Sequence, residues 1–359
     1  MRVTLGDVCE KGASNIKQSD IANMTGEYPI YGAAGYIGNV DFYHQEKPYV
    51  AIVKDGAGIG RTTLHPAKSS VIGTMQYLLP KDNVLPEYLC YVVRHMHLEK
   101  YFTGATIPHI YFRDYKNEKF NLDSLDKQAE IIEILGKAES IILKRRKELA
   151  ELDNLIKARF VELFGDPVNN SKNLPELTLP ELGEFGRGVS KHRPRNDPKL
   201  LGGEYPLIQT GEVANSELYI TNYENTYSEL GLKQSKMWKS GTLCITIAAN
   251  IAKTAILTFD ACFPDSVVGF KANNKTNNIF IHYWFSFFQA ILEAQAPESA
   301  QKNINLKILS ELKIIVPPIE KQNEFVAFVE QTDKSKVIVQ KALDEAQTLF
   351  DSLMQEYFG

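Results

Sequence analysis

The sequence predicts an α+β fold: two globular α/β domains separated by two long antiparallel α-helices, which pair as a coiled coil within a pseudo-two-fold internal repeat. Three observations predict it. A chain of 359 residues is long enough for two domains that each bury a core. The chain closes with "MQEYFG" and carries the similar "VELFGDP" in its middle, at 161–167. Two segments of about forty residues show the apolar spacing of long helices.

The two helical segments resemble one another closely. When residues 125–165 are aligned without a gap on residues 319–359, ten of 41 positions are identical. Unrelated sequences would share about two or three at average residue usage. The identities include a Lys-Gln pair near the start and the Phe-Gly pair at the end. The middle of the chain is therefore interpreted as the end of a first copy.

The repeat continues upstream of the helices. Each half runs in the same order, a variable globular region and then a long helix, and such a duplication predicts pseudo-two-fold symmetry. The matching stretches are 3–12 with 177–186, 26–32 with 203–211, and 104–110 with 298–304.

Both helices are expected to be continuous and paired. The first, over 124–164, contains no proline and repeats apolar residues at three- and four-residue steps from Ile132 to Leu163, with either Leu155 or Ile156 in the stripe. The second begins at Pro317 and Pro318, where a missing N–H is tolerated, and its stripe includes Val337 and Leu349. Forty residues span about 60 Å, and a narrow apolar stripe of that length needs a partner helix.

These patterns divide the chain into four parts. We expect a globular domain over 1–123, a central helical region with its linker over 124–167, a second globular domain over 168–316 and a C-terminal helical region over 317–359. Two domains held at a fixed spacing suit a two-part linear target. Duplex DNA read at sites about one helical turn (~34 Å) apart is one such target.

Composition favours a cytoplasmic protein without a membrane segment. The hydrophobic fraction is 44% and the charged fraction 23%, as in globular proteins. The chain does not open with the apolar region of a signal peptide. Its most apolar stretch, 281–294, is too short to span a bilayer and is predicted to be a core helix. The four cysteines form no CxxC pair and are expected to be reduced structural thiols.

Several strings carry a resemblance to a known family. "VPPIEKQNEF" (316–325) resembles a PPxxEQ motif that opens a helical region, and "NLDSLDKQAEI" (121–131) is a copy without the proline pair. "YPIYGAAGYIGNVDFY" (28–43) and "YVAIVKDGAGIGRTTLH" (49–65) resemble one class of target recognition domain, and "GVSKHRPRNDPKLLGGEYPLIQTGEV" (188–213) resembles a second. Over its whole length the chain resembles the specificity subunits of Type I restriction–modification systems.

The resemblance implies recognition without catalysis. Each target recognition domain is expected to read one half of an asymmetric, split duplex DNA site, and the helices to carry two modification subunits. Those subunits bind S-adenosylmethionine and methylate adenine, and restriction subunits that use ATP and Mg²⁺ join the complex. No cofactor is expected on this chain itself.

The residues themselves suggest no enzyme. The only Pro-Pro, in "IVPPIE", lacks the flanking residues of an adenine methyltransferase [D/N]PP[Y/F] loop. No metal site is predicted, because His95 and His97 lie two apart on an expected helix and point in different directions. The string "KDGAGIGRTT" (54–63) lacks the context of a dinucleotide or P-loop fingerprint. It is either a tight turn or a loop that approaches the DNA backbone, with Lys54 and Arg61 beside it.

Positive charge gathers in 187–199, "RGVSKHRPRNDPK", which its prolines keep from being helical. The segment is either a solvated loop or a DNA-contacting one. Because the net charge is −4, DNA binding must depend on such local patches or on a partner. The candidate DNA contacts are Tyr36, Lys54, Arg61, Thr74, Thr106 and His109 in the first domain, and Arg187, Lys191, His192, Arg193, Arg195, Lys199, Gln209, Thr210, Asn250, Lys253, Gln301, Lys302 and Asn303 in the second.

The helices carry the candidate partner contacts at matched positions of the repeat. These are Lys127, Gln128 and Glu130 in the first copy and Lys321, Gln322 and Glu324 in the second. The alternative function is a two-headed coiled-coil adaptor or recognition protein that does not bind DNA. Binding to duplex DNA that weakens steeply with salt would separate the two hypotheses.

Overall fold

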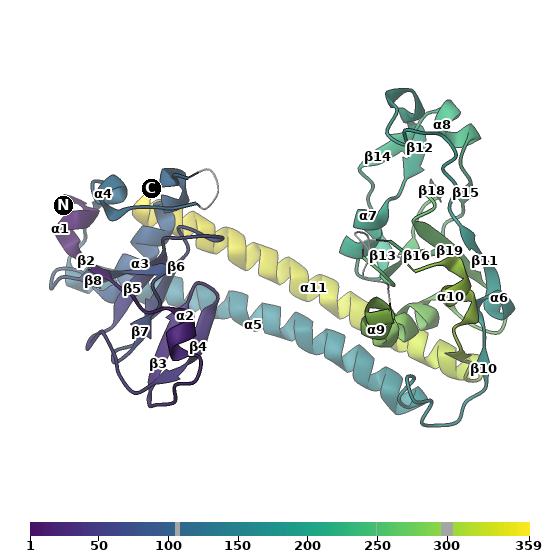
Figure 1. Ribbon diagram of the computed structural model, residues 1–359, viewed down its shortest axis with the longest axis horizontal. Helices are drawn as coiled ribbons and strands as arrows, with labels where there is room; N and C mark the ends of the chain where they lie inside the picture. Colours follow the sequence, from purple (N-terminus) through teal and green to yellow (C-terminus); the bar gives the residue numbers. More distant parts are fainter. Residues whose placement is uncertain (105–107, 249, 296–303) are drawn as a thin grey trace. The chain divides into compact units, whose positions relative to one another are not determined.

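The computed structural model describes residues 1–104, 108–248, 250–295 and 304–359 (Figure 1). The chain forms two compact units. Unit 1 comprises Met1–Lys147 and Val339–Gly359, and unit 2 comprises Glu148–Ile338. Each unit holds one globular domain and part of each long helix. None of the helices in the described part of the chain has the length and apolarity needed to cross a membrane.

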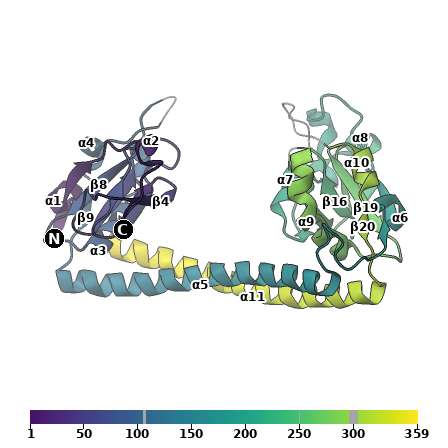
Figure 2. The ribbon, with the colours of Figure 1, turned by 60° about the horizontal axis from the view of Figure 1, so that its bottom comes forward.

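The two predicted long helices are present as α5 (Leu125–Phe164) and α11 (Ile319–Phe358), each of 40 residues. Within each unit they run antiparallel and side by side (Figure 2). In unit 1, Arg146 donates a hydrogen bond to Gln347 across the pair at 3.5 Å. In unit 2, Arg159 donates to Glu324 at 2.7 Å.

The buried face of the helices differs from the predicted stripe at several positions. Ile156 is buried, whereas Leu155 is 49% exposed. In α11, Val337 and Leu349 are 70% and 54% exposed, and Val339 is buried instead. A spacing of three and four leaves neighbouring phases of a helix equally plausible on the sequence. Packing decides at Ile156, which belongs to the apolar core of unit 2.

Domain 1, the part of unit 1 that precedes α5, contains two small sheets and one longer helix. Strands β1 (Arg2–Thr4) and β9 (Lys119–Asn121) pair separately. The larger sheet has the order β2 (Cys9–Ala13), β8 (Met75–Pro80), β5 (Tyr49–Val53) and β6 (Thr62–His65), and the smaller one the order β4 (Gly35–Val40), β3 (Tyr28–Gly32) and β7 (Ser70–Val71). The helices are α1 (Leu5–Val8), α2 (Gln18–Ile21), α3 (Pro86–His95), η1 (Leu98–Tyr101) and α4 (Phe112–Tyr115).

Domain 2, the part of unit 2 between α5 and α11, is built in the same way. Strands β10 (Glu176–Leu177) and β20 (Ile314–Ile315) pair separately. One sheet has the order β11 (Gly183–Arg187), β19 (Val267–Ala272), β16 (Leu243–Thr246), β17 (Thr254–Leu257) and β13 (Tyr219–Ile220), and the other the order β14 (Asn225–Tyr227), β12 (Leu201–Leu207), β18 (Ala261–Cys262) and β15 (Met237–Trp238). The helices are α6 (Leu179–Leu182), η2 (Pro198–Leu200), α7 (Thr210–Asn215), α8 (Glu229–Lys233), α9 (Asn278–Gln295) and α10 (Leu306–Glu311).

The strand pairing repeats between the domains. The order β2-β8-β5-β6 corresponds to β11-β19-β16-β17, and every neighbouring pair in both is antiparallel. Likewise β3 and β12 each pair antiparallel with one strand and parallel with another. In each domain the first strand pairs with the strand that immediately precedes a long helix. The internal repeat, predicted for the helices and for the globular regions upstream of them, is therefore present in both.

Each domain is fastened to its helices by a buried apolar core. In unit 2, Trp284 and Phe280 of α9 share a core with Phe160 of α5 and Phe325 of α11. Helix α9 contains the stretch 281–294, so the predicted core helix is confirmed. In unit 1, Leu135 of α5 belongs to the same core as helix α3. The four cysteines are buried free thiols, and burial raises the pKa of Cys90 to about 11.

The Phe-Gly pair that drew attention to the repeat ends α5. Gly165 has a φ of +76°, a left-handed conformation that glycine adopts readily, and its N–H donates to the Val161 carbonyl at 2.8 Å. At the second copy, the Gly359 N–H donates to the Gln355 carbonyl at 2.9 Å. Both Phe-Gly pairs therefore occupy the C-terminal end of a long helix.

Candidate nucleic-acid interface

In domain 1, the glycine-rich loop 54–61 between β5 and β6 gathers three of the predicted DNA contacts. The Lys54 N–H donates to the Thr74 carbonyl at 3.0 Å. Lys54 Nζ lies 3.3 Å from one carboxylate oxygen of Asp55, and His109 Nδ1 lies 2.6 Å from the other. Lys54, Thr74 and His109 are thus brought together around Asp55, a residue that the sequence analysis did not single out.

Arg61 and Tyr36 lie at the neighbouring turn. Arg61 is exposed, and its Nη1 donates to the carbonyl of Ala33 at 3.0 Å, in the turn between β3 and β4. Tyr36, in the same hairpin, is 62% exposed. The loop 54–61 and the β3–β4 turn therefore present one basic and one aromatic side chain to solvent, while Lys54 beside them is half-buried.

The glycines of this loop are required by its backbone. Gly56, Gly58 and Gly60 have φ values of +86°, +84° and +81°, in the left-handed region. A Cβ on Gly60 would also lie 2.7 Å from the backbone nitrogen of Glu99. The tight-turn interpretation accounts for the glycine run, and the turn is the element that displays Lys54 and Arg61.

In domain 2, the loop between β16 and β17 occupies the equivalent place. The Ile247 N–H donates to the Ser266 carbonyl at 3.0 Å, as Lys54 does to Thr74 in domain 1. The Ile304 N–H donates to the Ile247 carbonyl at 2.9 Å, and in domain 1 the Ile110 N–H donates to Lys54 at 3.0 Å. The predicted contacts Asn250 and Lys253 lie on this loop and are exposed. Two sets of residues chosen separately from the sequence thus fall on corresponding loops.

The basic segment 187–199 is held by an acidic residue, Asp265. Arg195 Nη2 lies 2.5 Å from Asp265 Oδ1, and Arg193 Nη2 lies 3.7 Å from Oδ2. Arg193 Nη1 also donates to the Ser190 carbonyl at 2.6 Å. The side chains of Arg193 and Arg195 remain 56% and 45% exposed. Asp265 therefore orients two guanidinium groups without covering them, and each keeps donors that can meet a phosphate or a guanine edge.

The rest of the segment is ordered by Gln234 and Asp197. The backbone N–H groups of Lys191 and His192 donate to Gln234 Oε1 at 2.7 and 3.0 Å. The Lys199 N–H donates to Asp197 at 3.0 Å and, with His192, holds the pKa of that carboxyl below its usual value. The lysine and histidine side chains are left exposed.

The remaining predicted DNA contacts lie apart from these clusters or at their ends. Lys199 and Gln209 are at opposite ends of β12, whose seven residues span roughly 20 Å. Gln209 and Thr210 begin α7. Arg187 ends β11 and is exposed. Four predicted contacts lie outside the described residues: Thr106, Gln301, Lys302 and Asn303.

The two glutamines predicted to bind a partner require a correction. Gln128 and Gln322 are fully buried, and both side chains hydrogen-bond to backbone groups of their own unit. Their side chains are enclosed and do not face a partner. Glutamine on a helix is ordinarily exposed, which is why the sequence alone suggested a surface role.

The matched Lys-Glu pairs on the same helices are at the surface. Lys127 Nζ lies 3.0 Å from Glu130, and Lys321 Nζ lies 2.7 Å from Glu324, each as an i,i+3 pair. The hydrogen bond from Lys321 lowers the pKa of Glu324. These four residues remain candidates for contact with a partner.

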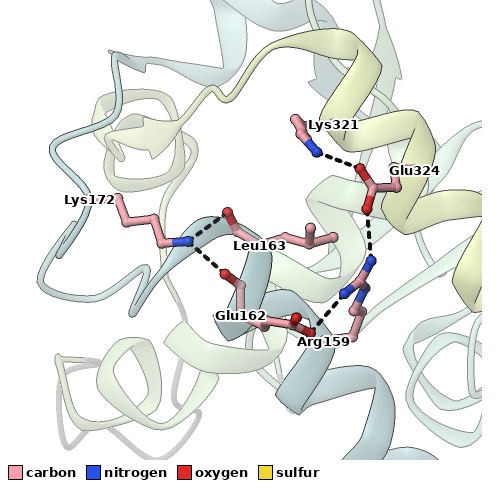
Figure 3. A network of polar contacts seen from close by, with 6 residues as sticks. All are labelled: Arg159, Glu162, Leu163, Lys172, Lys321 and Glu324. Atoms are coloured by element: carbon pink, nitrogen blue, oxygen red, sulfur yellow. Dashed lines mark hydrogen bonds and ion pairs between the residues drawn. The ribbon is translucent and has the colours of Figure 1, made fainter.

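In unit 2 the second pair joins a network at the end of α5 (Figure 3). Arg159 bridges Glu324 at 2.7 Å and Glu162 at 2.8 Å, and so links the two long helices. Lys172 Nζ donates to the carbonyls of Glu162 and Leu163 at 2.6 and 3.1 Å. These carbonyls lie in the last turn of α5 and lack partners within the helix, so Lys172 supplies the hydrogen bonds that they would otherwise miss.

Two similar domains, each with a polar loop at a corresponding place, define a duplicated recognition protein. A family profile described as "Type I restriction modification DNA specificity domain" matches residues 1–154 and 176–347, and the chain belongs to this family. The two matched segments correspond to the two halves of the repeat.

Known relatives agree with this assignment. The chain is 23% identical over 365 residues to a Methanocaldococcus jannaschii protein assigned as the MjaX type I restriction enzyme specificity subunit, over 97% of this chain and 82% of that one. It is 21% identical over 316 residues to a Haemophilus influenzae protein assigned as the type I specificity subunit S.HindORF215P, over 86% and 80% of the two chains.

Solved structures show that the fold is shared. The S subunit of a type I restriction-modification system from M. genitalium has a TM-score of 0.61 at 15% identity, over 100% of this chain and 96% of that one. A chain from a structure described as "complex assembly and conformational transition of the type I R-M system" has a TM-score of 0.57 at 15% identity, over 99% and 97%.

Proposed function

We propose that this chain is the DNA-specificity subunit of a Type I restriction–modification complex, and that each domain reads one half of a two-part, asymmetric duplex DNA site. The observation that carries the proposal is the duplicated fold with different residues on corresponding loops. One backbone frame presents Lys54 and Arg61 in domain 1 and Asn250 and Lys253 in domain 2. Equal frames with unequal side chains suit a site whose halves differ in sequence.

The basic segment of domain 2 supplies the best-formed contacts. Arg193 and Arg195, positioned by Asp265, offer the planar donors that suit a guanine edge. Lys191 and Lys199 suit phosphate, which fixes register without specifying sequence. Because the chain is acidic overall, the bound modification subunits are expected to supply part of the attraction to DNA.

The helices offer two equivalent surfaces for partners. Leu143 and Val337, which correspond in the repeat, are 64% and 70% exposed, and Leu155 and Leu349 are 49% and 54% exposed. Unit 1 contains Leu143 and Leu349, and unit 2 contains Val337 and Leu155. Each unit thus displays one member of each pair, and exposed apolar groups favour a protein contact. This supports the docking of two copies of one modification subunit.

In this complex the chain contributes recognition and assembly. S-adenosylmethionine would be bound by the modification subunits, and ATP with Mg²⁺ by restriction subunits. The chain alone is expected to show no methylation, cleavage or ATP hydrolysis.

Domain exchange tests the proposal. Replacing residues 168–316 with the corresponding domain of another specificity subunit should change one half of the methylated motif and leave the other half and the gap intact. The measurement is methylome sequencing of a host that carries each version. A motif changed in both halves would contradict the modular reading. A complex that shows no salt-dependent binding to duplex DNA would favour the non-DNA adaptor instead.

Stoichiometry tests the role of the helices. Native mass spectrometry at saturating modification subunit should show two copies per chain. Leu143→Glu should weaken one of the two sites and Val337→Glu the other, because each places a charge in an apolar contact. A stable one-to-one complex of the wild-type chain would overturn the two-surface proposal.

A further inference from the structure

The buried glutamines of the repeat make matching sets of hydrogen bonds. In unit 1, Gln128 Oε1 accepts from the Leu85 N–H at 2.8 Å, and Nε2 donates to the carbonyls of Asn83 and Asp123, both at 3.0 Å. Asn83 and Leu85 lie in the turn between β8 and α3. Asp123 lies in the strand-to-helix junction, five residues before the glutamine.

Gln322 repeats this arrangement in unit 2. Its Oε1 accepts from the Asn277 N–H at 3.2 Å, and its Nε2 donates to the Lys275 carbonyl at 3.0 Å, in the turn between β19 and α9. A second Nε2 bond reaches the Pro317 carbonyl at 2.9 Å, again five residues before the glutamine. The Thr276 hydroxyl adds one bond to Oε1 at 2.9 Å. In both units the amide therefore joins a carbonyl and the N–H two residues later to the start of a long helix.

These two junctions fix how each domain sits on its helix. Each glutamine is fully buried and ties three segments together: the end of the domain, the first turn of the long helix and the turn that begins α3 or α9. A buried amide that bonds in three directions tolerates little rotation of one segment against another, because any rotation leaves buried polar groups unpaired.

The junctions also lie away from the DNA-reading loops. In domain 1, the loop 54–61 is bonded to Thr74, at the start of β8, whereas Asn83 follows the other end of that six-residue strand. In domain 2, Ser266 and Lys275 flank β19 in the same way. A change at the glutamine is therefore separated from the half-site contacts by the length of a strand.

We infer that Gln128 and Gln322 are positioning residues for the gap between the two half-sites. This rests on the proposed function: if each domain reads a half-site, the gap that the protein accepts depends on the angle at which each domain is held on its helix. If the attachment of a domain to its helix becomes less rigid, the protein should accept a wider range of gaps while each half-site is still read. The two glutamines should contribute alike because their bonding is alike.

The test is methylation by the complete complex of the chain with its modification subunits. The probes are duplexes with the wild-type motif at its native gap and at gaps one base pair shorter or longer. Gln128→Met and Gln322→Met keep the side-chain length and remove the hydrogen bonds. We expect each to reduce the ratio of rates between native and altered gaps by several-fold, with unchanged half-sites in the methylome. Gln128→Glu, which removes the two donors and keeps the shape, should do the same.

A matched control separates positioning from loss of stability. Val40→Ala removes buried methyl groups from β4 in domain 1, in a core cluster separate from the one that contains the junction, and should lower methylation on all duplexes in proportion. If the variants at Gln128 and Gln322 keep the wild-type ratio of methylation rates between native and altered gaps, this inference is overturned and the proposed function still stands. A wild-type complex that methylates no two-part motif would overturn the proposed function as well.

Discussion

Domains 1 and 2 share a backbone plan but place their positive charge differently. In domain 1 the candidate cations Lys54 and Arg61 lie on the loop between β5 and β6, where the half-buried Lys54 pairs with Asp55 and Arg61 is exposed. In domain 2 the corresponding loop carries Lys253, while the denser charge lies in 187–199, beside Asp265. In both domains an acidic side chain pairs with part of the basic group: Asp55 with Lys54 and Asp265 with Arg195.

The difference shows which features of the repeat are held constant. The matched features are backbone hydrogen bonds and buried groups, such as the bonds from Ile110 and Ile304 or the amides of Gln128 and Gln322. The features that differ are exposed side chains on loops. A backbone bond does not depend on side-chain identity, so recognition can diverge while the frame and its attachment to the helices persist.

The largest expected effect comes from removing the charge that distinguishes domain 2. The double variant Arg193→Ala/Arg195→Ala should weaken specific DNA binding by the complex, by about 1–3 kcal/mol for each arginine that meets a base. Discrimination should relax in the half-site read by domain 2 and stay sharp in the other. The measurement is binding affinity against base substitutions in each half-site, at one fixed salt concentration.

Two variants sharpen this comparison. Lys239→Ala removes one exposed cation of domain 2 outside the basic segment and should leave discrimination unchanged. Arg61→Ala should relax the half-site read by domain 1 instead. Equal loss of discrimination in both halves after the double arginine substitution would contradict the assignment of one half-site to each domain.

The sequence predicted the parts of the molecule whose signal is periodic or repeated. The long helices, their Phe-Gly ends and the core helix α9 follow from apolar spacing and from proline or glycine at defined positions. The repeat upstream of the helices was visible in short matching stretches, but the order and pairing of the strands could not be predicted, because the strands are short and pair across long separations. Asp265 is an example at the site: it is far in sequence from Arg195, and only the fold brings them to 2.5 Å.

Gln128 shows a second reason why a prediction from the sequence was wrong. Its identity in both copies was visible, but a polar helix residue gives no sign of burial when its hydrogen-bond partners are backbone groups of a distant turn. Backbone partners leave no pattern in the sequence, since every residue type supplies them. The repeat identified the position, and the structure was needed to show what it does.

The smallest expected effect concerns one histidine in each domain, the buried His65 and the half-buried His282. His65 in domain 1 bonds to Thr63 at 2.7 Å, and His282 in domain 2 bonds to Thr254 at 2.9 Å. Burial lowers the pKa of each to about 4, because the charged imidazolium is poorly solvated there. With an unfolded pKa near 6.5, the unfolded chain binds the proton first as the pH falls. The contribution of each neutral histidine to the free energy of unfolding is therefore present above about pH 6.5 and is lost progressively towards pH 4. Between pH 7 and pH 5 the loss is about 2 kcal/mol per histidine.

The two tryptophans allow this effect to be assigned to one domain. Trp238 and Trp284 both lie in domain 2, so tryptophan fluorescence during urea unfolding reports on that domain. Between pH 7 and pH 5 the wild-type midpoint should fall. In His282→Gln, whose glutamine cannot be protonated, the midpoint should fall less, because the contribution of His282 to the pH dependence is removed. In His65→Gln the midpoint detected by fluorescence should fall as in the wild type, because this substitution alters domain 1. An equal reduction in both variants would mean that the two domains unfold together, as a single cooperative unit coupled through the long helices.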